Sequence, residues 1–171
     1  ASAPKVSDTL FLEMHKYFDP SFVAALIDKM DATMPEVIAW HNWCWEEAEK
    51  TGIVYDGFGT PRILYSPKRE LRQTAYSWPT QATASGIMNR SLVRIYHAKR
   101  AGLLRSDTRC ICQVHDSLVF EIHEDHVESE ARIIKALMEE PVTIFGRRTV
   151  FPVEAKSGSN WSEMKEMRFA A

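Results

Sequence analysis

The chain has 171 residues, of which 45% are hydrophobic and 26% are charged. These values are typical of an ordinary globular domain, and they exclude an intrinsically disordered or collagen-like chain. The formal net charge of −2 provides no general attraction for nucleic acid, so a nucleic-acid site would have to be a local patch.

Two helices are predicted in the first third of the chain. In residues 20–30 apolar side chains recur at helical spacing, after Asp19, a capping residue type, and Pro20, which suits a first turn. Residues 35–50 have one broad apolar side, and Gly52 can end that second helix.

Three tryptophans on the second helix, Trp40, Trp43 and Trp45, allow two interpretations. Aromatic rings stack on bases in grooves that bind single-stranded nucleic acid. On an apolar helix, however, a place in the core or in a partner interface is the more frequent role.

The middle of the chain predicts a small hairpin and then a long helix. Residues 53–55 and 62–65 are β-prone and flank a stretch rich in turn residues, whereas residues 67–72 are basic and irregular. After Pro79 a helix is predicted to about residue 101. Its core-facing residues are expected to be Ile87, Leu92, Ile95 and Tyr96.

A second hairpin is predicted from residues 108–114 and 118–122, which alternate like strands around His115, Asp116 and Ser117. An Asp at such a tip projects its carboxylate away from the sheet, where Mg²⁺, which prefers carboxylates and phosphates, could meet it. Asp is also a common turn former, so this pattern alone leaves both roles open.

The last third predicts a helix over residues 124–138 and a strand over residues 150–155.

The chain has three cysteines, Cys44, Cys110 and Cys112, so any disulfide scheme leaves one of them unpaired. Cys110 and Cys112 are also too close along a strand to bridge comfortably. No apolar run is long enough to cross a bilayer, and residues 1–9 lack the regions of a signal peptide. We therefore expect a reduced, cytoplasmic or nucleoid-associated protein.

Four stretches resemble the carboxy-terminal part of family A (Pol I-like) DNA polymerases. QVHDSLVFEI, residues 113–122, is similar to the family's motif C, a strand-turn-strand that presents a His-Asp pair. WPTQATASGIMNRSLVRI, residues 78–95, resembles the helix that begins with Pro-x-Gln-Gly/Ala-Thr-Ala. Residues 34–62 and 153–166 agree in order and spacing, so the resemblance runs from about Phe18 onward.

The resemblance implies roles for the residues at the hairpin tip. Asp116 would help to bind the two catalytic Mg²⁺ ions, and His115 would contact the backbone of the primer terminus. Ser117 stands where many members have Glu. Glu121 is given only a secondary role, because alternation along the strand places it an odd number of residues from Asp116.

The resemblance also implies DNA contacts around the long helix. Gln81 matches the glutamine that reads minor-groove acceptors of the terminal base pair. Ser77 stands in place of the family Asn, and the nearby family Arg falls on Gln73, with Arg72 adjacent, so contacts at this end depart from the pattern. Basic residues that could hold phosphates, or simply form a solvated loop, are Arg62, Lys68, Arg69 and Arg72.

Three arginine and lysine residues further along the same helix, Arg90, Arg94 and Lys99, lie at spacings of four and five. They would partly share a face directed toward DNA or an acidic neighbour. Most such faces only keep a helix soluble.

Two catalytic parts of the family have no match in these residues, namely the Asp-Tyr-Ser-x-Ile-Glu motif and the helix that holds the incoming nucleotide. The implied function is therefore that of a DNA-directed DNA polymerase subunit or fragment, which extends a primer 3′ end by two-metal nucleotidyl transfer. Primer-template DNA, deoxynucleoside triphosphates and a second polypeptide with the missing parts would be its partners. An excised fragment or an inactive remnant is also open.

Two other functions compete with polymerisation. A non-catalytic module that grips primer-template would need only the DNA-binding residues. A metal-dependent nuclease built on His115 and Asp116 lacks the carboxylate cluster that such sites require.

The implied fold is α+β, with an antiparallel palm sheet whose catalytic hairpin packs on long helices. Residues 1–66 would form distal fingers helices and a small hairpin, and residues 67–171 would form the palm portion.

Overall fold

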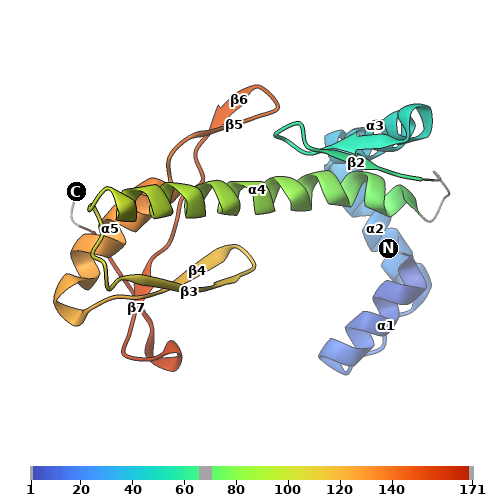
Figure 1. The fold of residues 1–171 in the computed structure, drawn as a ribbon. Coiled ribbons are helices and arrows are strands. Elements are labelled where there is room, and N and C mark those ends of the chain that lie inside the picture. Colours follow the sequence, from blue (N-terminus) through green and yellow to red (C-terminus); the bar gives the residue numbers. More distant parts are fainter. Residues whose placement is uncertain (1, 66–70, 170–171) are drawn as a thin grey trace. The chain divides into compact units, whose positions relative to one another are not determined.

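The structure is a computed structural model that describes residues 2–65 and 71–169 (Figure 1). Over these residues the fold is α+β, as the sequence predicts, and helices accompany four two-stranded sheets. In chain order the elements are α1 (Ala3–Met14), α2 (Pro20–Thr33), α3 (Pro35–Thr51), β1 (Ile53–Tyr55), β2 (Pro61–Ile63), α4 (Arg72–Arg100), β3 (Arg109–Val114), β4 (Ser117–Glu121), the short 3₁₀ turn η2 (Glu124–His126), α5 (Val127–Met138), β5 (Val142–Ile144), β6 (Arg147–Thr149), β7 (Lys156–Ser157), η3 (Trp161–Glu163) and β8 (Lys165–Glu166).

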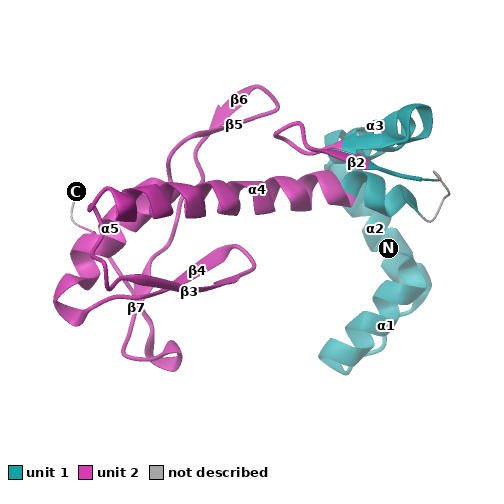
Figure 2. Ribbon diagram, in the orientation of Figure 1, with its two compact units in different colours: residues 1–54, 63–76 teal, residues 55–62, 77–171 magenta. Residues whose placement is uncertain are grey.

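The chain divides into two compact units (Figure 2). Unit 1 comprises residues 1–54 and 63–76, and unit 2 comprises residues 55–62 and 77–171. The division into fingers and palm portions at residue 66 stays a prediction.

Helix α2 begins, and helix α3 begins and ends, at the residues that the sequence marks, whereas α2 continues to Thr33, beyond the predicted end at residue 30. The Asp19 side chain accepts a hydrogen bond from the Ser21 amide at 2.8 Å, which satisfies one of the free N–H groups of the first turn of α2. Gly52 ends α3 with a φ of 68°, a conformation that glycine adopts without a steric cost. Helix α1, in contrast, was not predicted; its buried Ser7 donates a hydrogen bond to the Phe18 carbonyl.

The core of unit 1 combines branched apolar side chains, such as Val23 and Leu64, with small side chains of two helices. Cys44 and Ala48 of α3 are buried, as is Ala75 in the first turn of α4. Beside them the rings of His41 and Tyr76 stack with centroids 4.0 Å apart. Of the three tryptophans, Trp43 is 55% exposed, so the apolar side of α3 is only partly covered.

Burial also controls the chemistry of Cys44. Desolvation raises the pKa of the Cys44 thiol to about 11, so the thiol stays protonated at neutral pH. The thiolate is the reactive form. We expect native Cys44 to resist maleimide at pH 7.5 and to react only after unfolding, while Cys110, which is exposed, reacts in the native state. Mass spectrometry of labelled peptides distinguishes the two; fast labelling of native Cys44 would contradict the packing of α3.

Helix α4 begins earlier than predicted. It starts at Arg72 and contains Pro79, which the sequence analysis placed before the helix. An interior proline removes one backbone hydrogen bond and costs about 3 kcal/mol. The first turn offsets this cost through tertiary contacts, because Ala75 is fully buried and Tyr76 stacks on His41.

The core of unit 2 joins α4, the β3–β4 hairpin and α5. Ile95 and Ala98 of α4 pack with Leu104 and with Ile134 of α5, and residues of β4 and its flank, with others of α5, close this cluster: Leu118, Phe120, Ile122, Ile133, Leu137 and Met138. Tyr96, predicted to face the core, is 56% exposed. That prediction was wrong because the buried face of α4 runs through Ser91, Ile95 and Ala98.

The prediction of a strand over residues 150–155 was also wrong, since these residues lie outside any strand. The strands instead flank them: β5 pairs with β6, and β7 with β8. Pro152 fits this arrangement because it lacks the N–H that a ladder requires. In the described part of the chain no helix has the length and apolarity needed to cross a bilayer.

Candidate catalytic hairpin and its surroundings

The β3–β4 hairpin places His115 and Asp116 at its tip. Its register pairs Val114 with Ser117, so Ser117 begins β4 and the turn has two residues instead of the three predicted. The ladder continues to the pair Arg109 and Glu121, with an irregularity between Cys110 and Cys112. Such a bulge increases the local twist of the strand.

The tip is exposed and its backbone is unusual. His115 has a φ of 54°, which is uncommon for a residue with a side chain, and the Gln113 side-chain amide donates to its carbonyl at 3.1 Å. Within residues 2–65 and 71–169, no hydrogen bond or ion pair engages the Asp116 carboxylate. An outward carboxylate with free lone pairs is available to a cation. Outliers of backbone geometry concentrate at functional sites.

The base of the hairpin is anchored on both neighbouring helices. Leu118 and Phe120 of β4 pack against the α4–α5 cluster. The buried Glu130 carboxylate of α5 accepts from the Arg105 amide at 2.8 Å and from the Thr108 hydroxyl. Lys99 of α4 donates to the Thr108 carbonyl at 2.5 Å. The hairpin is therefore fixed where β3 begins, and in Figure 1 its turn points toward the amino-terminal half of α4.

The predicted DNA-contacting residues of α4 share a side of that helix. Ser77 and Gln81 are four residues apart, which places them on one face. Gln81 is exposed, and the Ser77 carbonyl accepts from the Thr80 hydroxyl at 2.8 Å. Arg62 of β2 lies with its guanidinium carbon 5.7 Å from the Trp78 ring centroid. These three predicted residues are thus neighbours within unit 2.

Other predicted residues have separate environments. Arg72, in unit 1, donates to the Asn42 side chain at 2.8 Å. Lys68 and Arg69 lie outside the described residues. Glu121 is exposed and sits at the far end of the ladder from Asp116.

The donor set at the tip can supply only part of a metal site. In the part of the chain that the structure describes, no three His, Cys, Asp or Glu side chains lie close enough together to hold a metal ion. Asp116 is a hard oxygen ligand of the type that Mg²⁺ prefers. It therefore fits a magnesium site as one ligand among others that come from elsewhere.

The turn-rich stretch predicted between residues 55 and 62 forms a loop at residues 56–60, whose internal hydrogen bonds the sequence did not predict. The buried Asp56 carboxylate accepts from the amides of Phe58 and Thr60 at 2.9 and 2.8 Å. The Gly57 amide donates to the Thr83 hydroxyl of α4 at 2.7 Å, and the Thr83 hydroxyl donates to the Pro79 carbonyl. The signal for this loop was the Asp-Gly pair, which is typical of an Asx turn.

Gly86 allows one edge of the Phe58 ring to approach α4 closely. A Cβ at position 86 would stand 2.8 Å from two ring carbons, closer than carbon atoms approach. Gly86→Ala should gain about 1 kcal/mol of helix propensity but lose about 1–3 kcal/mol through overpacking. We expect a net fall in thermal stability, whereas Asn89→Ala, at an exposed position of the same helix, should be neutral or stabilising. A higher melting temperature for Gly86→Ala would show that Phe58 does not pack there.

The hairpin thus presents an exposed Asp at its turn, and its base packs on α4 and α5. The family described as DNA polymerase family A matches residues 18–163. The chain belongs to this family.

Curated relatives agree with the family. The chain is 36% identical over 149 residues to DNA polymerase I of Pseudomonas aeruginosa, covering 81% of this chain and 15% of the relative. It is 30% identical over 151 residues to the thermostable DNA polymerase I of Thermus aquaticus, covering 83% and 17%. The chain thus spans about a sixth of the length of the curated relatives it matches.

A solved structure supports the fold. The POL domain of an M. smegmatis polymerase, determined in complex with DNA primer-template and dNTP, superposes with a TM-score of 0.68 and 21% sequence identity. The match covers 87% of this chain and 26% of that one.

Proposed function

We propose that this chain supplies the catalytic hairpin and part of the DNA-binding surface of a DNA-directed DNA polymerase. The observation that carries the proposal is the Asp116 carboxylate, which stands exposed and unengaged by the described residues at the tip of a hairpin in a family A chain. Its substrates would be primer-template DNA and deoxynucleoside triphosphates.

Each residue of the site would have a separate task. Asp116 would hold Mg²⁺ as one of several carboxylate ligands, and His115 would orient the primer terminus beside it. Two bound Mg²⁺ ions supply charge stabilisation for the attacking and leaving oxygens. Gln81, with Ser77 beside it, would contact the minor groove, and Arg62 and Arg72 would contact phosphates.

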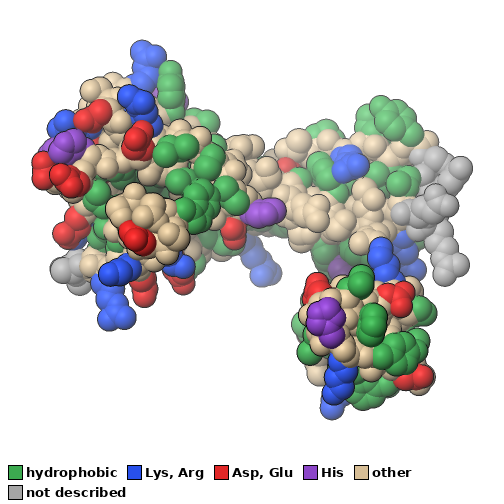
Figure 3. Space-filling model, turned by 90° about the horizontal axis from the view of Figure 1, so that it is seen from below, with side chains coloured by type: hydrophobic (Ala, Val, Ile, Leu, Met, Phe, Trp, Pro, Cys, Tyr) green, Lys and Arg blue, Asp and Glu red, His purple; other side chains and the backbone are tan. Residues whose placement is uncertain are grey.

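The remaining catalytic parts would come from a second polypeptide. The support is a set of exposed apolar side chains on α1, α2 and α3, here called the apolar helical surface: Phe11, Leu12, Met14, Phe22, Leu26, Met30, Met34, Val37 and Trp43. Hydrophobic side chains also lie at the surface in the view of Figure 3. Large exposed apolar patches mark interaction sites, so we expect the partner to bind at the apolar helical surface.

Purification from the native source tests both parts of the proposal. Native mass spectrometry should find a stoichiometric partner that carries the Asp-Tyr-Ser motif, and the complex should extend a primer in the presence of Mg²⁺. Leu26→Ser with Met30→Ser should weaken the association, while Lys29→Ser, exposed on the same helix, should not. A stable monomer that is active alone would refute the need for a partner. A complex that does not extend a primer would refute the polymerase activity.

A further inference from the structure

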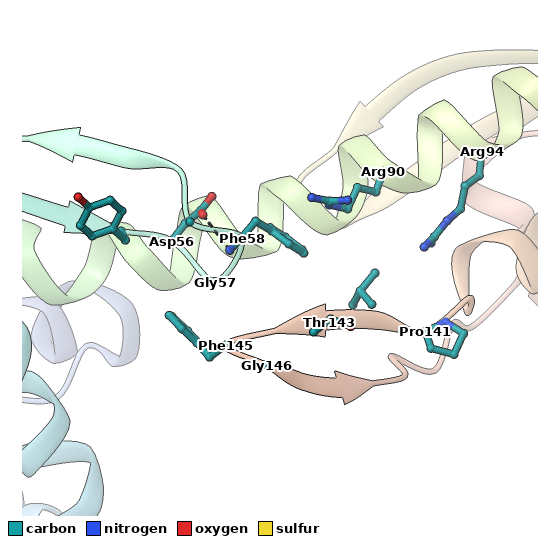
Figure 4. A pocket seen from close by; sticks show the side chains of 12 residues that line it. Asp56, Gly57, Phe58, Arg90, Arg94, Pro141, Thr143, Phe145 and Gly146 are labelled. Atoms are coloured by element: carbon teal, nitrogen blue, oxygen red, sulfur yellow. Dashed lines mark hydrogen bonds between the residues drawn. The ribbon is translucent and has the colours of Figure 1, made fainter.

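We propose that a second site, on the side of α4 away from Gln81, binds a segment of single-stranded nucleic acid. The site is a cavity of about 650 Å³ within unit 2, bounded by the loop at residues 56–60, by α4 and by the β5–β6 hairpin (Figure 4). A phosphate would lie at Arg90 and a base against the ring of Phe145. Both residues line the cavity.

Arg90 is the cation that is free to receive a phosphate. Its guanidinium carbon lies 4.2 Å from the centroid of the Phe58 ring, which holds the side chain extended over the loop. Among residues 2–65 and 71–169 no carboxylate pairs with it. Arg94, one turn further along α4, is engaged instead, because its Nε lies 2.9 Å from the Glu140 carboxylate.

The acidic groups near the cavity are already satisfied. The Asp56 carboxylate accepts two backbone hydrogen bonds and is 5% exposed. Glu140 pairs with Arg94. The β5–β6 hairpin adds two exposed arginines, Arg147 and Arg148. Arg147 and Arg148 do not line the cavity itself, but together with Arg90 and Arg94 they outnumber the carboxylates of Asp56 and Glu140, so this part of unit 2 is positive although the whole chain carries −2. Positive charge is what a phosphodiester backbone requires.

The tip of the β5–β6 hairpin displays an aromatic ring at a conformational cost. Phe145 and Gly146 form the two-residue turn with φ values of 47° and 78°. Positive φ at both positions favours Asn-Gly, and it is unfavourable for a bulky residue. The Phe145 amide donates to the Gly57 carbonyl at 3.1 Å, yet the side chain stays 62% exposed. The fold needs the turn but not the ring.

Arginine beside exposed aromatic rings is the combination that binds single strands without base-specific hydrogen bonds. Tyr55, 53% exposed, adds a second ring to the lining. Gly59 and Gly146 also line the cavity, and the space beside them is open, because a Cβ at either would meet nothing within 4 Å.

The position of the cavity separates it from the proposed primer-template contacts. At about 3.6 residues per turn, residue 90 is two and a half turns after residue 81, and thus on the opposite side of α4. The cavity is therefore a site additional to the proposed primer-template contacts. Its test does not require polymerisation.

Fluorescence anisotropy with labelled oligothymidylate tests the site, using the purified protein together with any stable partner that accompanies it. Phe145→Asn removes the ring but suits the turn, so the melting temperature should not fall. Arg90→Gln removes the free cation. We expect each variant to bind about tenfold more weakly, the value of one lost stack or phosphate contact.

Arg100→Gln is the matched control, since Arg100 also belongs to α4 and stacks on an aromatic ring, Tyr96, at 5.9 Å, but lies outside the cavity. Its binding should remain at the wild-type value. Equal losses for Arg90→Gln and Arg100→Gln, or unchanged binding by Phe145→Asn, would overturn the proposal. Oligouridylate in parallel distinguishes the source: equal affinity means either nucleic acid, and tighter binding means RNA.

Discussion

Asp116→Asn should reduce primer extension by the assembled polymerase roughly 10³-fold or more, equivalent to at least about 4 kcal/mol of transition-state stabilisation. Removing one charged oxygen ligand weakens the metal site, while Asn keeps the turn, because Asn and Asp both suit this position. The affinity for primer-template should change less than about twofold. Single-turnover extension and filter binding on the same preparation separate the two quantities.

The control for this variant is Asp125→Asn, since Asp125 is also an exposed carboxylate near the hairpin but lies in η2, after β4. Extension by that variant should equal the wild-type rate. If Asp116→Asn retained full extension, the chain would be a DNA-gripping module, and the catalytic role of the hairpin would have to be abandoned.

Glu130→Ala should lower the free energy of unfolding by about 2–4 kcal/mol, more than any other substitution described above. The buried carboxylate accepts hydrogen bonds from the Arg105 amide and the Thr108 hydroxyl, and an unsatisfied buried donor costs about 1–3 kcal/mol. Relief of the desolvation of the carboxylate offsets part of this cost, so the two donors do not contribute their full sum. Urea denaturation followed by fluorescence measures the difference in the free energy of unfolding.

Glu128→Ala, two residues earlier in the same helix, is the comparison. Its carboxylate is 72% exposed and pairs with Arg132 at 3.2 Å, so its removal should cost less than about 0.5 kcal/mol. Glu130→Gln, which keeps one acceptor, should fall between the two. Similar unfolding energies for all three variants would mean that the buried hydrogen bonds do not hold the base of the hairpin.

Local signals predicted the elements that local chemistry decides. Asp19, Pro20 and Gly52 mark helix ends because capping depends only on neighbouring backbone groups. The alternation around His115 and Asp116 placed the hairpin, and its register moved Ser117 from the turn into β4. Family A membership followed from the order of the motifs.

Tertiary contacts decided the elements that were predicted wrongly. Pro79 normally starts a helix, but burial of Ala75 extends α4 toward the amino terminus. Tyr96 fits the apolar periodicity of α4, but its side chain is exposed, and the buried face of the helix carries the smaller Ala98 instead. The turn at Phe145 and Gly146 was not predicted, because a bulky residue such as Phe145 rarely adopts a positive φ.

The cavity beside α4 illustrates why sites escape sequence analysis. Phe58, Arg90 and Phe145 come from three distant stretches of the sequence, and only the fold brings them to one cavity. Periodicity shows which face of a helix is apolar or charged, but not what that face meets. The same reason hides what covers the apolar helical surface.

The loop at residues 56–60 also has a consequence for the order of events during synthesis. Its Gly57 amide bonds to Thr83, 26 residues later, whereas its carbonyl bonds to the amide of residue 145, at a separation of 145 − 57 = 88 residues. The hairpin core around β3, β4 and α5 depends on much shorter separations and closes loops at a smaller entropic cost. During synthesis on the ribosome we therefore expect the hydrogen bond between Gly57 and Thr83 to form first. The hydrogen bond between Gly57 and Phe145 can form only after the β5–β6 turn has emerged. Destabilising that turn should slow the last step of folding more than the first.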